Sequence, residues 1–187
     1  MSAFVDAYVV DQRLYVPHRK VGFLPSTAAG GLRRPCIRIG IPERRLWAKL
    51  RLLFMHPETV LVQIDTGADT TAMNRDTAAK FGVNLDNYKA EEVEVVTLAD
   101  GSVCVAVRRQ MDLVICNWVL EDVPVLFPLR GDQAVVELMR LRPDPFKRAG
   151  LPLSPRELRA NVLGIEGVLD KVLLCLDSEN VYLFRRR

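Results

Sequence analysis

The residues best suited to chemistry in this sequence are a carboxylate, a hydroxyl and a glycine in direct succession, Asp65-Thr66-Gly67. They follow the apolar run Val60–Val62, which predicts a buried strand ending at the acid. Because such a strand would fix Asp65, and Gly67 would let the backbone turn sharply and approach a ligand, the acid would be held rigidly at the mouth of a cleft. A carboxylate held in this way is suited to general acid–base catalysis.

Three further segments are expected to position this turn. Asn74–Gly82 predicts a short helix, with the asparagine as N-cap and the glycine as the stop. Val95–Val105 predicts two strands joined by a turn at Asp100-Gly101. Asn161–Leu169 brings an apolar-apolar-Gly pattern near the end of the chain.

These segments together resemble a known family. Val62–Thr71 resembles the active-site strand and turn of retropepsin-like aspartic proteases, and the three other segments match the family's helix, its flap hairpin and the strand that packs behind the catalytic loop. The matches come in the family's order and cover roughly residues 58–184. The resemblance implies a mainly-β fold, a small closed acid-protease barrel with one or two short helices.

The chemistry that the resemblance implies is peptide hydrolysis. Without a metal or a nucleophilic Ser or Cys, this reaction needs a water, a base to deprotonate it and an acid to protonate the leaving group. Two carboxylates a few ångströms apart supply both roles, because like charges that close cannot both ionise and the pair shares a proton.

The chain holds only one Asp-Thr-Gly and no Asp-Ser-Gly in its 187 residues. Pepsin-like chains that carry both carboxylates are longer and have two such motifs. The second carboxylate is therefore expected from another copy of the chain, in a symmetric homodimer with Asp65 of each subunit on the two-fold axis. A monomer is expected to be inactive.

The resemblance also implies roles for the residues around Asp65, by matching each position to the family motif. Thr66 resembles the threonine whose hydroxyl bonds across the dimer axis, and Gly67 the glycine whose carbonyl faces the substrate backbone. Asp69 resembles the acid that accepts hydrogen bonds from substrate main-chain amides. Ala68, also in this substrate-binding stretch, cannot donate a hydrogen bond to the catalytic carboxylate as Ser or Thr would, which moves the expected pH optimum toward mild acid.

The expected flap tip completes the predicted substrate site. Asp100, Gly101 and Ser102 form its turn and are expected to close over the substrate and shed water.

Two features depart from the family pattern. Retroviral enzymes carry a basic residue after the Leu163-Gly164 pair, which binds the acid matched here to Asp69; this chain has Ile165, so Asp69 must find another partner, such as an arginine elsewhere, or stay solvated. The stretch Phe127–Ala160 is also longer than in a minimal retroviral enzyme, which marks an insertion at about 128–160.

The insertion holds one predicted helix over Ala134–Arg140 and a proline-rich part, in which Ser154-Pro155 predicts a second helix start. It could shape the cleft, add to the dimer interface or decorate the surface.

Two parts are expected along the chain, an N-terminal extension or leader over 1–34 and a protease domain over 35–187. The extension holds one or two strands in Phe4–Val16 and a flexible joint at Pro25–Gly31. It could pair into a dimer sheet, be removed by self-cleavage, or be a plain extension. The remaining predicted strands are Cys36–Ile39, Leu46–Phe54, Leu173–Leu176 and Val181–Phe184.

The composition is typical of a globular protein, with 49% hydrophobic and 26% charged residues. No run of eighteen apolar residues predicts a membrane span, and Met1–Val10 lacks the pattern of a signal peptide. We expect a cytoplasmic protein without a membrane partner.

No cofactor or metal is expected. His18 and His56 are too isolated for a metal site or a Ser-His pair, and the cysteines lack Cys-x-x-Cys spacing, which favours reduced core thiols. The net charge of +3 is mild, so no nucleic-acid partner is expected and the short basic clusters predict solvated edges. The four cysteines are Cys36, Cys104, Cys116 and Cys175.

Two functions remain open from the sequence. The favoured one is a dimeric aspartic endopeptidase that takes an extended polypeptide substrate with apolar side chains near the cut. The alternative is a catalytically weak retropepsin-fold module that binds peptides or only dimerises. The intact Asp65-Thr66-Gly67 favours the enzyme. The lack of a basic residue at Ile165 and the long insertion are the reasons for retaining the alternative.

Overall fold

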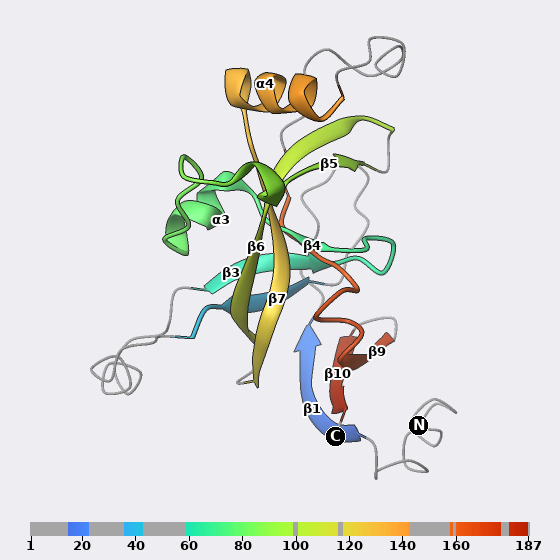
Figure 1. Cartoon of the computed structure of the whole chain (residues 1–187). Coiled ribbons are helices and arrows are strands. Elements are labelled where there is room, and N and C mark those ends of the chain that lie inside the picture. Colours follow the sequence, from blue (N-terminus) through green and yellow to red (C-terminus); the bar gives the residue numbers. More distant parts are fainter. Residues whose placement is uncertain are drawn as a thin grey trace, which may run out of the picture.

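The computed structural model describes residues 15–22, 36–42, 59–98, 101–115, 118–142, 158, 160–176 and 180–186 of the chain. Most of these residues lie in strands, and two α-helices and one short 3-10 helix, η1 (Ala90–Glu92), accompany them (Figure 1).

Six strands close into a barrel. The hydrogen-bonded order is β2-β3-β8-β4-β7-β6, and β6 returns to β2 through the pairs Ile39–Ile115 and Gly40–Val114. The seventh strand, β5, extends the sheet beyond β6. This confirms the mainly-β closed barrel expected from the sequence. The strands are β2 (Cys36–Gly40), β3 (Thr59–Ile64), β4 (Thr71–Ala72), β5 (Val93–Thr97), β6 (Val103–Ile115), β7 (Trp118–Pro128) and β8 (Val162–Leu163).

A separate three-stranded antiparallel sheet contains β1 (Tyr15–Gly22), β10 (Asn180–Arg186) and β9 (Val172–Leu176). The two expected C-terminal strands are confirmed. Tyr15 and Val16 of the expected N-terminal strands lie in β1, which runs on to Gly22. The rest of that expectation, residues 4–14, lies outside the described part. Whether residues 1–34 form a removable leader stays a prediction.

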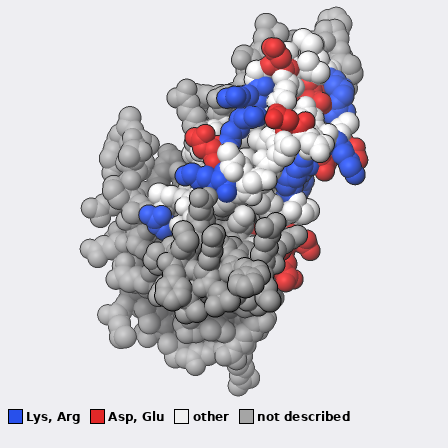
Figure 2. Space-filling view, turned by 90° about the vertical axis from the view of Figure 1, so that its left-hand side faces the viewer, with Lys and Arg blue, Asp and Glu red and all other residues white. Residues whose placement is uncertain are grey.

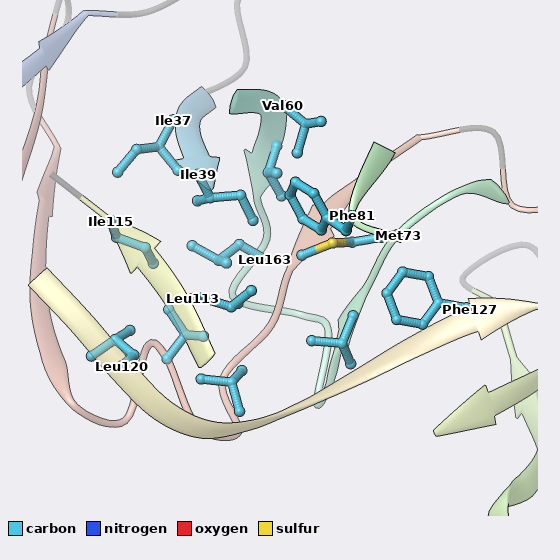
Figure 3. Close-up of a cluster of buried hydrophobic side chains, with 14 of the residues drawn as sticks. Ile37, Ile39, Val60, Met73, Phe81, Leu113, Ile115, Leu120, Phe127 and Leu163 are labelled. Atoms are coloured by element: carbon cyan, nitrogen blue, oxygen red, sulfur yellow. The ribbon is translucent and has the colours of Figure 1, made fainter. Parts of the chain in front are cut away.

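The barrel interior is filled by apolar side chains from both ends of the described sequence (Figure 3). On β3, Val60, Val62 and Ile64 are buried and alternate with more exposed neighbours, as a strand with one face on a core requires. Leu163 of β8 and Met73, which follows β4, are fully buried among them. Each such side chain stabilises the fold by roughly 1.5–3 kcal/mol, so the core fixes the strand that leads into Asp65.

The two helices form as the sequence predicts. Helix α3 (Arg75–Lys80) starts at Asn74, whose Oδ1 accepts a hydrogen bond from Thr77 N at 2.9 Å, and Gly82 after its end has φ +67°. Helix α4 (Gly131–Leu141) confirms the predicted helix in the insertion and extends it at both ends.

Helix α4 covers one face of the β5–β6 hairpin. Its buried residues Ala134 and Leu138 pack against Val93, Val105 and Val107 of the two strands. The helix is therefore packed against the β5–β6 hairpin through its own buried residues. No helix among the described residues is long and apolar enough to cross a membrane.

Some expectations lie outside the described residues. They are the strand at 46–54, the Pro25–Gly31 joint, the helix start at Ser154-Pro155 and Cys116. Of the cysteines, Cys104 is a buried free thiol, as expected, and Cys36 is partly buried. On the face drawn in Figure 2, basic and acidic side chains of the described residues lie next to one another.

Candidate active site

The turn after β3, called the Asp65 turn below (residues 65–70), is built around one carboxylate. The Asp65 amide donates to Leu163 O at 3.1 Å, which ties the start of the turn to β8. Asp65 Oδ1 accepts a hydrogen bond from Gly67 N at 2.9 Å, and Ala68 N donates to Asp65 O at 3.2 Å. Since both backbone and carboxylate of Asp65 are bonded, the partly buried acid has a defined position at the end of the strand.

At Gly67 the space for a side chain is limited, whereas its backbone is not left-handed. A Cβ built on Gly67 would lie 3.3 Å from Asp65 Oδ1, closer than ordinary contact, whereas its φ is not positive. A side chain here would press on the carboxylate that the Gly67 amide holds. From the sequence, this glycine was expected to let the backbone turn sharply; the structure adds the close approach of its Cβ position to the carboxylate.

The segment after β8 runs beside the Asp65 turn. Ile165 N donates to Ala68 O at 2.9 Å and Glu166 N to Asp69 O at 2.7 Å, and Thr70 and Glu166 form a parallel bridge. The expectation that residues 161–169 pack behind the loop is confirmed. The loop is therefore held by backbone hydrogen bonds at its start, Asp65, and at Ala68 and Asp69 in its second half.

Other predicted site residues on the loop face outward. Thr66 and Asp69 are exposed, and Ala68 is partly buried. Among the described residues, no side chain binds the Asp69 carboxylate, and Ile165 beside it is 42% exposed. Within the described part of the chain, Asp69 is exposed, which agrees with the solvated one of the two outcomes expected for it.

The predicted flap residues lie on a different element, the turn between β5 and β6. Gly101 has φ +79°, and its amide donates to Leu98 O at 2.9 Å, while Leu98 N donates to Ser102 O at 2.8 Å. The glycine thus supplies the positive φ that the tight turn needs. The predicted hairpin is confirmed; Asp100 lies outside the described residues.

The hairpin is joined to the Asp65 turn through a small apolar cluster. Cys104 and Ala106 of β6 and Leu126 of β7 are buried together, and Ala72 of β4 packs against them. Since Ala72 follows the turn by only two residues, the hairpin stem and the turn share packing. In Figure 1 the tip of the hairpin and the turn after β3 lie on the same, right-hand side of the view.

Comparisons with known proteins agree with this geometry. A family model for aspartyl proteases matches residues 58–166, which include the turn, the hairpin and the segment behind the loop. The chain belongs to the aspartyl protease family.

The fold of this aspartyl protease family member is also found in a solved structure. It is similar to a retropepsin-like aspartic protease from Rickettsia conorii, with a TM-score of 0.51 and 14% sequence identity over 92% of this chain and 94% of that one. At this identity the likeness concerns the fold alone, which is retropepsin-like. No curated protein matches the sequence.

Two anchoring groups near the turn were not identified from the sequence. Asn161 Oδ1 accepts from Asn74 N at 2.9 Å and from Thr77 Oγ1 at 3.0 Å, and its Nδ2 donates to Leu61 O at 3.1 Å. This side chain ties the start of α3 to β3. Its place in the Asn-apolar-apolar-Gly pattern was the signal that could have marked it.

The second group is an ion-pair network beside the Asp65 turn. Arg108 of β6 binds Glu166 and Glu94, and Glu166 also accepts a hydrogen bond from Thr70 Oγ1 at 3.0 Å. Hydrogen bonds to Glu94, and to a lesser extent Glu166, raise the pKa of Arg108. No local sequence signal pairs Arg108 with Glu166, which lies 58 residues further on.

The described residues hold no group of three or more His, Cys, Asp or Glu side chains placed to bind a metal ion.

Proposed function

We propose that this protein is a homodimeric aspartic endopeptidase whose catalytic pair is Asp65 from each of two subunits. The observation that carries the proposal is the Asp65 turn, in which the acid is bonded at its backbone and at its carboxylate, in a chain of this family that has only one such motif. One turn supplies one carboxylate, and the reaction needs two.

In the proposed mechanism, the two carboxylates share one proton. The ionised carboxylate accepts a proton from a water, which attacks the peptide carbonyl carbon, and the protonated partner donates its proton to the reacting peptide. Gly67 N donates to Asp65 Oδ1 at 2.9 Å, so that oxygen is held in place and Oδ2 is the atom left for water. The carbon–nitrogen bond then breaks as the leaving amine takes up the proton that the first carboxylate accepted from the water. The other carboxylate takes a proton from a hydroxyl of the tetrahedral intermediate, so that the pair again holds one proton.

The neighbouring residues bind and orient the substrate in this proposal. The exposed Thr66 hydroxyl is available to its copy across the axis, and the exposed Asp69 carboxylate is available to substrate amides. Gly67 presents its carbonyl to the substrate backbone. The hairpin tip with Asp100, Gly101 and Ser102 closes over the bound peptide and excludes water.

One observation favours a second candidate, a peptide-binding or dimerisation module with weak catalysis. Asp69 has no basic partner among the described residues, and the position after Gly164 is the exposed Ile165. A less firmly held Asp69 would bind the substrate backbone less tightly.

The test is the cleavage of a diverse peptide pool between about pH 3.5 and 7.5 by the wild type and by Asp65→Asn, with the size of each protein measured by sedimentation in the same samples. The proposal expects cleavage by the wild-type dimer alone and none by Asp65→Asn. Cleavage that survives in folded Asp65→Asn would disprove the assignment. A folded wild-type dimer that cleaves nothing would favour the binding module.

A further inference from the structure

The side chain of Arg108 lies between two carboxylates that come from different parts of the barrel. Its Nη1 is 3.0 Å from Glu94 Oε1 on β5, and its Nη2 is 2.7 and 2.6 Å from the two oxygens of Glu166. Glu94 and Arg108 belong to the stem of the hairpin, whereas Glu166 belongs to the segment behind the Asp65 turn. Arg108 therefore connects the two elements that enclose the proposed substrate site.

Glu166 in turn contacts Asp69 and Thr70, the part of the turn that is proposed to bind the substrate backbone. Its Oε2 accepts from Thr70 Oγ1 at 3.0 Å, and its amide donates to Asp69 O at 2.7 Å. Both the side chain and the backbone of Glu166 thus hold the two residues that follow Ala68. Asp65 is held separately, by Gly67 N and Leu163 O.

The direction of Arg108 follows from its place in the strand. Side chains of β6 alternate between two faces, and Arg108 shares its face with Cys104 and Ala106, which pack toward Ala72 of β4. Arg109 points to the opposite face, where its guanidinium binds Glu92 and donates to Asn87 O. Two adjacent arginines therefore support different regions.

An exposed ion pair by itself contributes little to stability. The side chain of Arg108 is 29% exposed and that of Glu166 is 51% exposed. We therefore expect the pair to orient the two side chains and to add little to the free energy of unfolding. Nη2 lies within hydrogen-bond distance of both Glu166 oxygens while Nη1 binds Glu94, so the guanidinium is held between two carboxylates. Hydrogen bonds between charged groups are short and favour a defined orientation of the partners. Asp69 lacks a basic partner of its own among the described residues, and Glu166 binds both its backbone oxygen and the Thr70 hydroxyl, so Glu166 helps to orient these two residues.

We propose that Arg108 is a positioning residue for substrate binding, which acts through Glu166 to hold Asp69 and Thr70 in place and to link them to the hairpin stem. The inference rests on the proposed function, since it takes Asp69 as the group that binds the substrate backbone. Loss of Arg108 weakens substrate binding and leaves the anchors of Asp65 intact.

The kinetic test compares Arg108→Ala with Arg109→Ala, a neighbour of the same charge whose partners lie on the other face. Arg108→Ala is expected to raise KM about five- to tenfold and to change kcat by less than about twofold, while Arg109→Ala changes neither by more than about twofold. Arg108→Lys keeps the charge but cannot bind two carboxylates in the same fork, so its KM is expected to lie between those of wild type and Arg108→Ala. A drop in kcat without a rise in KM, or equal effects of the two alanine variants, would overturn the proposal.

A second measurement does not need activity. Hydrogen–deuterium exchange of peptides covering residues 65–73 and 163–170 is expected to speed up in Arg108→Ala and to stay at the wild-type rate in Arg109→Ala. If the wild type cleaves no peptide, the proposed function fails, but exchange still decides whether Arg108 holds the turn. If Arg108→Ala does not fold, Glu166→Gln, which removes the charge and keeps the shape, is measured in its place. Unchanged exchange in a folded variant would refute the positioning role.

Discussion

At the scale of single residues, Gly164 shows how closely two crossing segments approach beside the Asp65 turn. A Cβ on Gly164 would lie 2.4 Å from the carbonyl carbon of Thr70 and 2.8 Å from Thr71 N. These atoms belong to backbone that is fixed by its own hydrogen bonds, so they cannot give way. Glycine is therefore the only residue that fits here, although its φ is not positive.

Gly164→Ala is expected to lower the free energy of unfolding by about 2–4 kcal/mol, because the added methyl group forces the two segments apart. The control is Gly82→Ala. That position has φ +67° and open space around the added Cβ, so backbone strain alone costs about 1 kcal/mol. Urea denaturation of both variants measures the difference. Equal losses would mean that the segments behind the turn can separate without strain.

Cys104 gives a prediction that depends on pH. Burial raises the pKa of its thiol to about 11. Because the thiolate is the reactive form, Cys104 in the folded protein is expected to resist alkylation by iodoacetamide at about pH 8, and to react once the chain is unfolded in urea. Peptide mapping, with the partly buried Cys36 as the internal comparison, measures both rates. Labelling of Cys104 as fast in the folded as in the unfolded protein would contradict its burial.

The same shift has a consequence for stability. The unfolded thiol ionises near pH 8.5, so the contribution of the neutral buried thiol is complete below about that pH. It is lost as the pH rises through the raised pKa of about 11.

At the scale of elements, the position of α3 depends on one side chain from the other end of the chain. Asn161 accepts hydrogen bonds from Asn74 and Thr77 at the start of the helix and donates to Leu61 O of β3. The helix and β3 are thereby fixed to each other at the entry to β8. No apolar residue could satisfy all three groups.

Asn161→Ala is expected to destabilise the fold by about 2–3 kcal/mol, because it leaves partly buried donors and an acceptor without partners. Asn84→Ala is the matched control: Asn84 Oδ1 accepts only the exposed amide of Asp86, two residues away, and its loss is expected to cost under about 1 kcal/mol. Thermal or urea unfolding of the two variants provides the comparison. An Asn161→Ala protein as stable as Asn84→Ala would show that α3 is held by packing alone.

At the scale of the whole molecule, the single Asp-Thr-Gly motif makes the proposed activity a property of two chains. If both carboxylates come from Asp65, a subunit that carries the Asp65→Asn substitution inactivates any dimer that it joins. Wild type mixed with an equal amount of Asp65→Asn and allowed to exchange subunits is then expected to keep about one quarter of the activity of the same total concentration of wild type.

The control for this prediction is a mixture with an unrelated inert protein, which leaves the wild-type dimers intact. If each chain were active alone, the mixture with Asp65→Asn would keep about one half of the activity, whatever the exchange time. That outcome would remove the shared catalytic pair from the proposal.

Several features of the fold and site were predictable because they depend on neighbours within a few residues. The strand that ends at Asp65, the helix capped by Asn74 and the hairpin turn at Gly101 all follow from local apolar alternation, a side-chain cap and one positive φ. The continuation of the N-terminal strand to Gly22 was not predicted, since β1 owes its position to pairing with β10 at the opposite end of the chain. Strand pairing between residues so far apart in the sequence leaves no local pattern from which the bounds of β1 could be predicted.

The sequence by itself therefore determined the Asp65 turn, the family and the mainly-β class, since these are recorded in short runs of residues. Only the tertiary structure decided what supports the turn. From the sequence, an arginine elsewhere in the chain was one possible partner for Asp69. In the structure Arg108 binds Glu166, 58 residues away, and Glu166 binds Thr70 across 96 residues. Closure of the barrel sets these distances, because it brings β6, β8 and the end of β3 together through strand pairing that no single segment encodes.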